Sequence, residues 1–215
     1  MSIQFKGNHP HISKAGLRKQ QWLSAYELHK AGDRVIAATL DGNMMQALGQ
    51  VWGGINPKAD DLVEKRTLIA APTNFGAQLL LETWRKRAAE DGFVIGRDLP
   101  SRALGSILRN LAVFEPIDNQ TDFHVRLAGT GMLRRFGRDI TGKRLSEIFP
   151  PQLFERRKAM IFATIHSGQP VMGDIELAHG DRKPLRFEVI VLPVLAPDRV
   201  TPWALAGVFY HDWES

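Results

Sequence analysis

The amino-acid sequence predicts an α+β fold: a five-stranded antiparallel sheet with helices on one face, preceded by a mostly helical N-terminal extension. Residues 122–128 alternate between apolar and polar side chains, as a half-buried strand does. Residues 171–178, 184–195 and 202–213 are strand segments joined by short turns, which require antiparallel neighbours. One longer helix, 150–166, opens at a Pro pair, with Gly168 following at the expected stop.

The first part of the chain has a weaker hydrophobic pattern. Residues 1–12 are polar and predict a loose tail. Helices are predicted at 13–31 and 41–51, whereas the short apolar segment 34–40 fits a strand or a helix equally. Residues 53–76 contain Gly, Pro and Asn repeatedly, which indicates a connecting stretch.

We therefore place an extension and linker at 1–77 and a second domain at 78–215. A helix is predicted to begin at Asn74 as N-cap and to end near Asp91. Its apolar stripe consists of Ala77, Leu80, Leu81, Trp84 and Ala88. Because 189–192 is apolar at every position, we expect this helix or a partner subunit to cover the second face of the sheet.

Shorter elements connect these parts. Ser101 is predicted to cap a short helix that ends at Arg109, and residues 111–117 form a strand candidate. Two short helical pieces are predicted at roughly 130–137 and 144–148.

Gly129 and Gly131 follow a strand and precede a helix, as in a dinucleotide-binding fingerprint. The third glycine of that motif is misplaced and no βαβ unit surrounds it. We interpret the pair as a turn that requires positive φ, with Thr130 capping the next helix.

The composition limits the chemistry. In 215 residues, 44% are hydrophobic and 24% charged, which allows a sizeable core. There is no cysteine, which excludes disulfides, thiolate catalysis and cysteine-based metal sites. No run of 18 apolar residues and no secretory leader pattern is present, so we expect a cytoplasmic protein without a membrane span.

The sequence contains no convincing catalytic or metal-binding set. The seven histidines lack metal-ligand spacing, and no GxSxG elbow is present. Glu176 and Glu188 are interpreted as surface carboxylates on neighbouring strands. We therefore expect neither an enzyme nor a metal site.

Four segments carry a family resemblance: DLPSR (98–102), FHVRLAGTGM (123–132), FGRDITGKRL (136–145) and HSGQPV (166–171). Over about residues 78–213 the chain resembles PAS-type sensory domains of alphaproteobacteria. The resemblance implies a sensory module, a cavity between sheet and helices that holds a small ligand or is closed, and homodimer contacts through the flanking N-terminal helix.

The resemblance also implies where a ligand would lie. Apolar side chains, with Thr164 and His166 as polar groups, are expected to line the cavity. The expected ligand-binding residues are Phe136, Met160, Ile161, Thr164, His166, Phe187 and Val189. Such a lining favours an apolar or aromatic molecule, unless the rings of Phe136 and Phe187 meet and fill the space.

The cofactor stays unknown. The missing cysteine excludes flavin-adduct photochemistry, while non-covalent flavin and haem remain open. His166 is either a haem ligand or a histidine favoured by the helix dipole at the C-terminal end of its helix.

The basic residues allow two interpretations. The formal net charge is +5. A solvated surface explains the arginine-rich stretch, and contact with an anion or a partner is the alternative. The candidates for that contact are Arg126, Arg134, Arg135 and Arg138. Arg126 lies mid-strand and needs either an acidic partner such as Glu115 or Glu188, or an anionic ligand.

Two functions follow from these observations. The first is a stand-alone sensory and regulatory module that signals to another protein, of unknown identity, by direct contact. The second is a basic regulator that binds nucleic acid; the missing helix-turn-helix motif argues against it.

Overall fold

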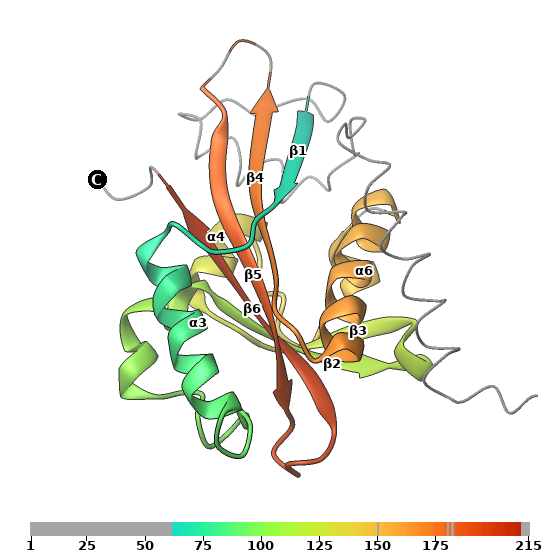
Figure 1. Cartoon of the computed structure of the whole chain (residues 1–215). Helices are drawn as coiled ribbons and strands as arrows, with labels where there is room; N and C mark the ends of the chain where they lie inside the picture. Colours follow the sequence, from blue (N-terminus) through green and yellow to red (C-terminus); the bar gives the residue numbers. More distant parts are fainter. Residues whose placement is uncertain (1–61, 150, 180, 182, 212–215) are drawn as a thin grey trace, which may run out of the picture. The chain divides into compact units, whose positions relative to one another are not determined.

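The computed structural model describes residues 62–149, 151–179, 181 and 183–211. The elements predicted before residue 53 lie outside these residues. Six strands form one antiparallel sheet in the order β1-β4-β5-β6-β2-β3 (Figure 1). The strands are β1 (Leu62–Leu68), β2 (Leu111–Ile117), β3 (Asp122–Ala128), β4 (Val171–His179), β5 (Leu185–Leu195) and β6 (Pro202–Tyr210).

Helices cover both faces of this sheet, with α3 on one side and α6 on the other (Figure 1). The helices are α3 (Phe75–Ala88), α4 (Thr130–Phe136), α5 (Leu145–Ile148), α6 (Pro151–Ser167) and the 3₁₀ helices η2 (Arg102–Asn110) and η3 (Asp118–Gln120). The α+β class is confirmed. The helices collected on the first face are α4, α5 and α6. The second face is covered by α3 and η2, which confirms the expectation that the helix containing Trp84 lies there. None of the described helices is long and apolar enough to cross a membrane.

The sheet has six strands rather than five. The added strand, β1, lies within the stretch predicted as a connection. It pairs with β4 from Leu62, opposite His179, to Leu68, opposite Gly173. The last strand, β6, ends at Tyr210 and not at residue 213 as predicted.

Alternate residues of β6 face opposite sides of the sheet, and their sizes differ. Large side chains pack toward α3 and η2, namely Trp203, Leu205 and Phe209. The alanines Ala204 and Ala206 face α6. Small side chains at the centre of a sheet leave space above them unless a neighbour fills it. The α6 side is therefore where the fold has room for a cavity.

Helix α3 begins and docks as its sequence indicates. The Asn74 side chain accepts a hydrogen bond from the Gly76 N–H at 2.8 Å, which confirms the predicted N-cap. The Trp84 indole N–H donates to the Pro193 carbonyl on β5 at 2.6 Å. This bond fixes the helix to the sheet. Of the predicted apolar stripe, Ala77, Leu80 and Leu81 are buried, Trp84 is half-buried and Ala88 is exposed.

Glu188 on β5 holds the turn that precedes α3. The residue is only 2% exposed. Its carboxylate accepts from the Thr73 N–H at 2.8 Å, the Thr73 hydroxyl at 2.5 Å and the Asn74 N–H at 3.1 Å. Glu188 is therefore a buried structural acceptor, and the prediction of a surface carboxylate is wrong.

Gly129 and Gly131 allow the start of α4 to approach the backbone of η2 closely. Neither glycine has a positive φ. Gly129 is the N-cap of α4 with φ −66°, and Gly131 is not among the positive-φ residues. A Cβ atom on Gly129 would collide with the Leu108 carbonyl oxygen and lie 2.6 Å from the Arg109 carbonyl oxygen. On Gly131 it would lie 2.6 Å from the same Arg109 oxygen. The start of α4 is thus packed directly on the backbone of η2.

Two predicted helix caps are wrong. Thr130 is the first residue of α4 rather than its cap. Ser101 stands at the N-cap position of η2, but its hydroxyl makes no capping hydrogen bond and is buried without a partner among the described residues. The 3₁₀ geometry of η2 differs from the α-helix that the cap rule assumes.

The buried carboxylate of Asp98 makes stability depend on pH. Burial raises the pKa of Asp98, but hydrogen bonds from Arg97 and from the Val94 N–H outweigh this. The positive charge of Arg87, 3.1 Å away, acts in the same direction, so the pKa of Asp98 lies below its ordinary value.

A pKa that is lower in the folded chain stabilises the fold at high pH. We expect this contribution to be complete above about pH 5 and to be lost as the pH falls below about 4. Chemical denaturation between pH 3 and 6 measures it. The Asp98→Asn variant should lose less stability on acidification than wild type does; parallel curves for the two proteins would contradict the prediction.

Candidate functional site

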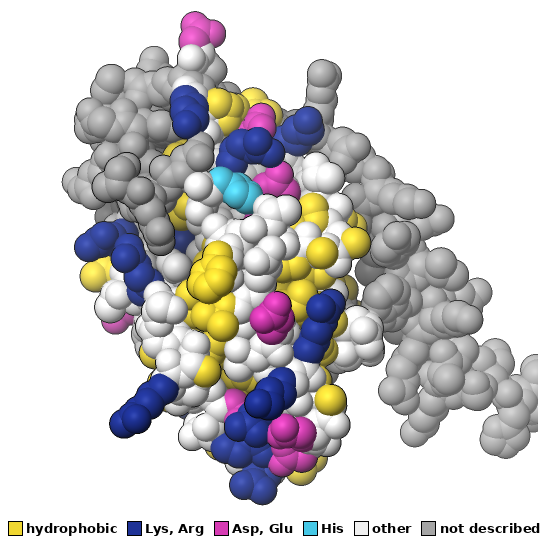
Figure 2. All heavy atoms as spheres, turned by 60° about the vertical axis from the view of Figure 1, so that its left-hand side comes forward, with side chains coloured by type: hydrophobic (Ala, Val, Ile, Leu, Met, Phe, Trp, Pro, Cys, Tyr) yellow, Lys and Arg dark blue, Asp and Glu magenta, His cyan; other side chains and the backbone are white. Residues whose placement is uncertain are grey.

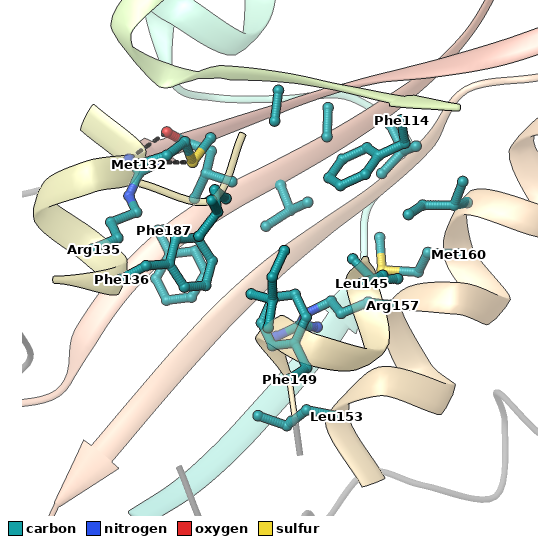
Figure 3. A pocket seen from close by; sticks show the side chains of 18 of the residues that line it. Phe114, Met132, Arg135, Phe136, Leu145, Phe149, Leu153, Arg157, Met160 and Phe187 are labelled. Carbon is teal, nitrogen blue, oxygen red and sulfur yellow. Dashed lines mark hydrogen bonds between the residues drawn. The ribbon is translucent and has the colours of Figure 1, made fainter. Parts of the chain in front are cut away.

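A cavity of about 170 Å³ lies between the sheet and the helices α4, α5 and α6. Its floor is formed by β2, β5 and β6, where Ala112 and Ala206 are too small to fill the space. Aromatic and aliphatic side chains from the helices and β5 enclose it (Figure 3). The wall is almost entirely apolar, which is typical of a pocket for a small organic molecule.

Five of the seven residues predicted to bind a ligand lie on this wall. They are Phe136, Met160, Ile161, Phe187 and Val189. They come from α4, α6 and β5, which the fold brings together around one space. Their role in binding stays a prediction.

The other two residues do not line the cavity. Thr164 is completely buried, one helical turn beyond Met160, and its hydroxyl has no partner among the described residues. His166 is exposed and its ring is stacked on Phe162, with centroids 3.7 Å apart. Its Nδ1 lies 2.9 Å from the Phe162 carbonyl oxygen. We therefore remove both residues from the candidate site.

Each of the two aromatic rings expected to decide the cavity's volume packs against another ring. Phe136 contacts Phe149 edge-on, with centroids 5.5 Å apart. Phe187 packs against Tyr210 with centroids 5.2 Å apart. Both phenylalanines line the cavity.

A buried ion pair lies on the same wall. The Arg157 guanidinium on α6 contacts the Glu64 carboxylate on β1 at 2.6 Å, and both side chains are largely buried. Burial and the charge of Arg157 lower the pKa of nearby Arg66 to about 10, although Glu64 opposes the shift. The sequence does not reveal this pair, because Glu64 lies in the stretch predicted as a connection and Arg157 stands among the consecutive basic residues 156–158.

Arg135 on α4 is the other charged group on the wall (Figure 3). One of its terminal nitrogens donates to the Val208 carbonyl at 2.7 Å, and another contacts the Met132 sulfur at 3.3 Å. The guanidinium lies over the Tyr210 ring, 4.7 Å from its centroid. Burial lowers the pKa of Arg135, and Tyr210 opposes this shift only in part.

The four arginines predicted to contact an anion or partner are not brought together. Arg126 lies 3.4 Å from Glu115, which is one of the two pairings expected for it, and 5.9 Å from the Trp203 ring centroid. Arg138 donates to the Glu147 carbonyl at 3.1 Å. Basic side chains are scattered among acidic and apolar ones on the face in Figure 2.

Arg134 and Arg135 do share one feature. Both line a hollow of about 690 Å³ at the protein surface, together with the start of α3 and residues of η2. Arg134 is exposed, whereas Arg135 also reaches the interior cavity. Within the described part of the chain, no group of three or more potential metal ligands occurs.

The antiparallel sheet with its helices is consistent with a PAS fold. A family model described as PAS domain matches residues 74–209, well over half of the chain. The chain belongs to the PAS domain family and is, in general terms, a sensory or regulatory module. No curated protein and no solved structure matches it significantly.

Proposed function

We propose that the chain is a sensory module that binds a small apolar or aromatic molecule in the interior cavity and signals through contacts with another protein. The apolar cavity of about 170 Å³ is the observation that carries the proposal. A filled core would have no such space, because protein interiors pack to the density of organic crystals.

The volume sets the size of the ligand. A dry apolar cavity of about 150 Å³ takes up benzene. The cavity is well below the roughly 300–1,000 Å³ of sites for drug-sized ligands. The ligand we propose therefore has one aromatic ring or a short alkyl chain, and it is smaller than haem or flavin.

We propose that the chain signals in the cytoplasm by contacting another protein. That protein is a second copy of the chain in a homodimer, a different signalling protein, or both in turn. Exposed apolar side chains on two helices support it: Phe75 on α3 is 76% exposed and Leu133 on α4 is 50% exposed. Light scattering of the full chain tests the dimer, and a monomer at every concentration would remove it from the proposal.

Ligand binding is tested by a thermal-shift screen of small aromatic and alkyl compounds. A ligand that binds only the folded state, present at 100 times its Kd, stabilises the fold by about 2.7 kcal/mol. For a domain of this size we expect a rise in Tm of about 5–10 °C.

The control is Ala206→Phe, which places a ring in the cavity from β6. This variant should lose the ligand-induced rise in Tm while keeping its far-UV circular dichroism. If no compound shifts the wild type, or if the variant responds equally, ligand binding in this cavity is excluded.

A further inference from the structure

No acidic side chain among the described residues forms an ion pair with Arg135. Its neighbours are the Val208 carbonyl, the Met132 sulfur, the Asn110 side-chain oxygen at 3.4 Å, and Tyr210 through both its ring face and a side-chain hydrogen bond. None of them is an acidic side chain. Its Nε is buried without a hydrogen-bond partner among the described residues. Arg135 is half-buried, and removing a cation from water without an opposite charge is costly to the folded state.

Arg157, the other arginine of the cavity, differs in this respect. Glu64 accepts from it at 2.6 Å, so its charge is already matched. The two arginines extend from different helices, α4 and α6 (Figure 3). The cation available to an anionic group in the cavity is therefore Arg135 on α4.

We infer that the ligand of this cavity carries a carboxylate on its apolar body, and that Arg135 binds the carboxylate. The inference rests on the proposed function and names the class of ligand. A single guanidinium matches a single negative charge, and charge-assisted hydrogen bonds of this kind are roughly twice as strong as neutral ones.

The position of Arg135 also fits a ligand with two unlike ends. The residue lines both the interior cavity and the surface hollow beside η2. The carboxylate of a bound molecule would lie at this junction, near solvent, while its ring or chain occupies the apolar interior. In this arrangement the carboxylate of the ligand stays hydrated while the ligand enters the cavity. Only the apolar part of the ligand then loses its water.

The test compares two molecules of nearly equal shape on the full chain by calorimetry: 3-phenylpropanoate and 3-phenylpropan-1-ol. We expect the acid to bind at least about tenfold more tightly than the alcohol. In the variant Arg135→Met, which keeps the length and apolar stem, the acid should lose at least tenfold in affinity and the alcohol less than threefold.

Arg85→Met is the control, because Arg85 is an exposed arginine on α3 that lines neither the cavity nor the surface hollow. It should keep the preference for the acid. Equal binding of acid and alcohol by the wild type would overturn the inference and leave the proposed function standing. Binding of neither molecule, while other apolar compounds shift the Tm, would overturn it as well. If Arg135→Met does not fold, the wild-type comparison still decides.

Discussion

Replacing Gly129 by alanine is expected to destabilise the fold by at least about 3 kcal/mol. The added methyl group would collide with the carbonyl oxygen of Leu108 and with the carbonyl group of Arg109. These atoms belong to the backbone, so no side-chain rotation relieves the contact. Relief requires α4 to move away from η2, which also moves Arg135 on the cavity wall. Urea denaturation at neutral pH measures the loss.

Gly105→Ala is the matched control, since Gly105 lies within η2 and a Cβ there meets no atom within 4 Å. Its backbone φ is not in the positive range. The change should leave stability unaltered or raise it slightly, because alanine reduces the freedom of the unfolded chain. Equal effects of the two substitutions would show that α4 and η2 are not in the close contact described.

Replacing Glu188 by alanine is expected to reduce stability by about 2–4 kcal/mol. The change removes a buried acceptor from the amide and hydroxyl of Thr73 and the amide of Asn74. The turn before α3 then loses its attachment to β5. Because α3 covers β5 and β6 on one face of the sheet, we also expect increased binding of a hydrophobic dye.

Glu176→Ala provides the comparison on the neighbouring strand. Its carboxylate is half-exposed and lies 3.8 Å from Arg186, an arrangement that contributes little in water. This variant should lose less than about 0.5 kcal/mol. A Glu188→Ala protein as stable as Glu176→Ala would mean that the turn at Thr73 does not depend on the carboxylate.

The elements from Asn74 to Tyr210 follow local rules that the sequence displays. The Asn74 cap and the stop at Gly168, with φ 65°, are each set by neighbouring residues. Such features are visible in a single sequence because their physical causes lie within one turn of a helix or one strand.

β1 was missed because its pattern is not hydrophobic. Its inward-facing Glu64 is buried through an ion pair with Arg157, which lies 93 residues further along the chain. Outward-facing Val63 is 47% exposed. A strand that buries a charge and exposes an aliphatic residue reverses the usual alternation, and only its distant partner explains it.

The sequence predicted the apolar residues of the cavity wall better than the charged residues of that wall. Apolar residues such as Met160 and Phe187 point inward for the same reason that any core residue does. In the pair Arg134 and Arg135, however, consecutive helical residues point about 100° apart, and the two are chemically identical. Composition does not reveal which of them is turned inward; packing of α4 on the sheet decides it.

The strand order also determines when the sheet is completed during folding. β6 is the last strand along the chain and occupies the position between β5 and β2, so the β2–β3 pair joins the rest of the sheet only through it. Until residues 202–210 pair, β1-β4-β5 and β2-β3 are two separate groups of strands. Such non-local closure slows folding and lengthens the time during which unpaired strand edges are open to aggregation.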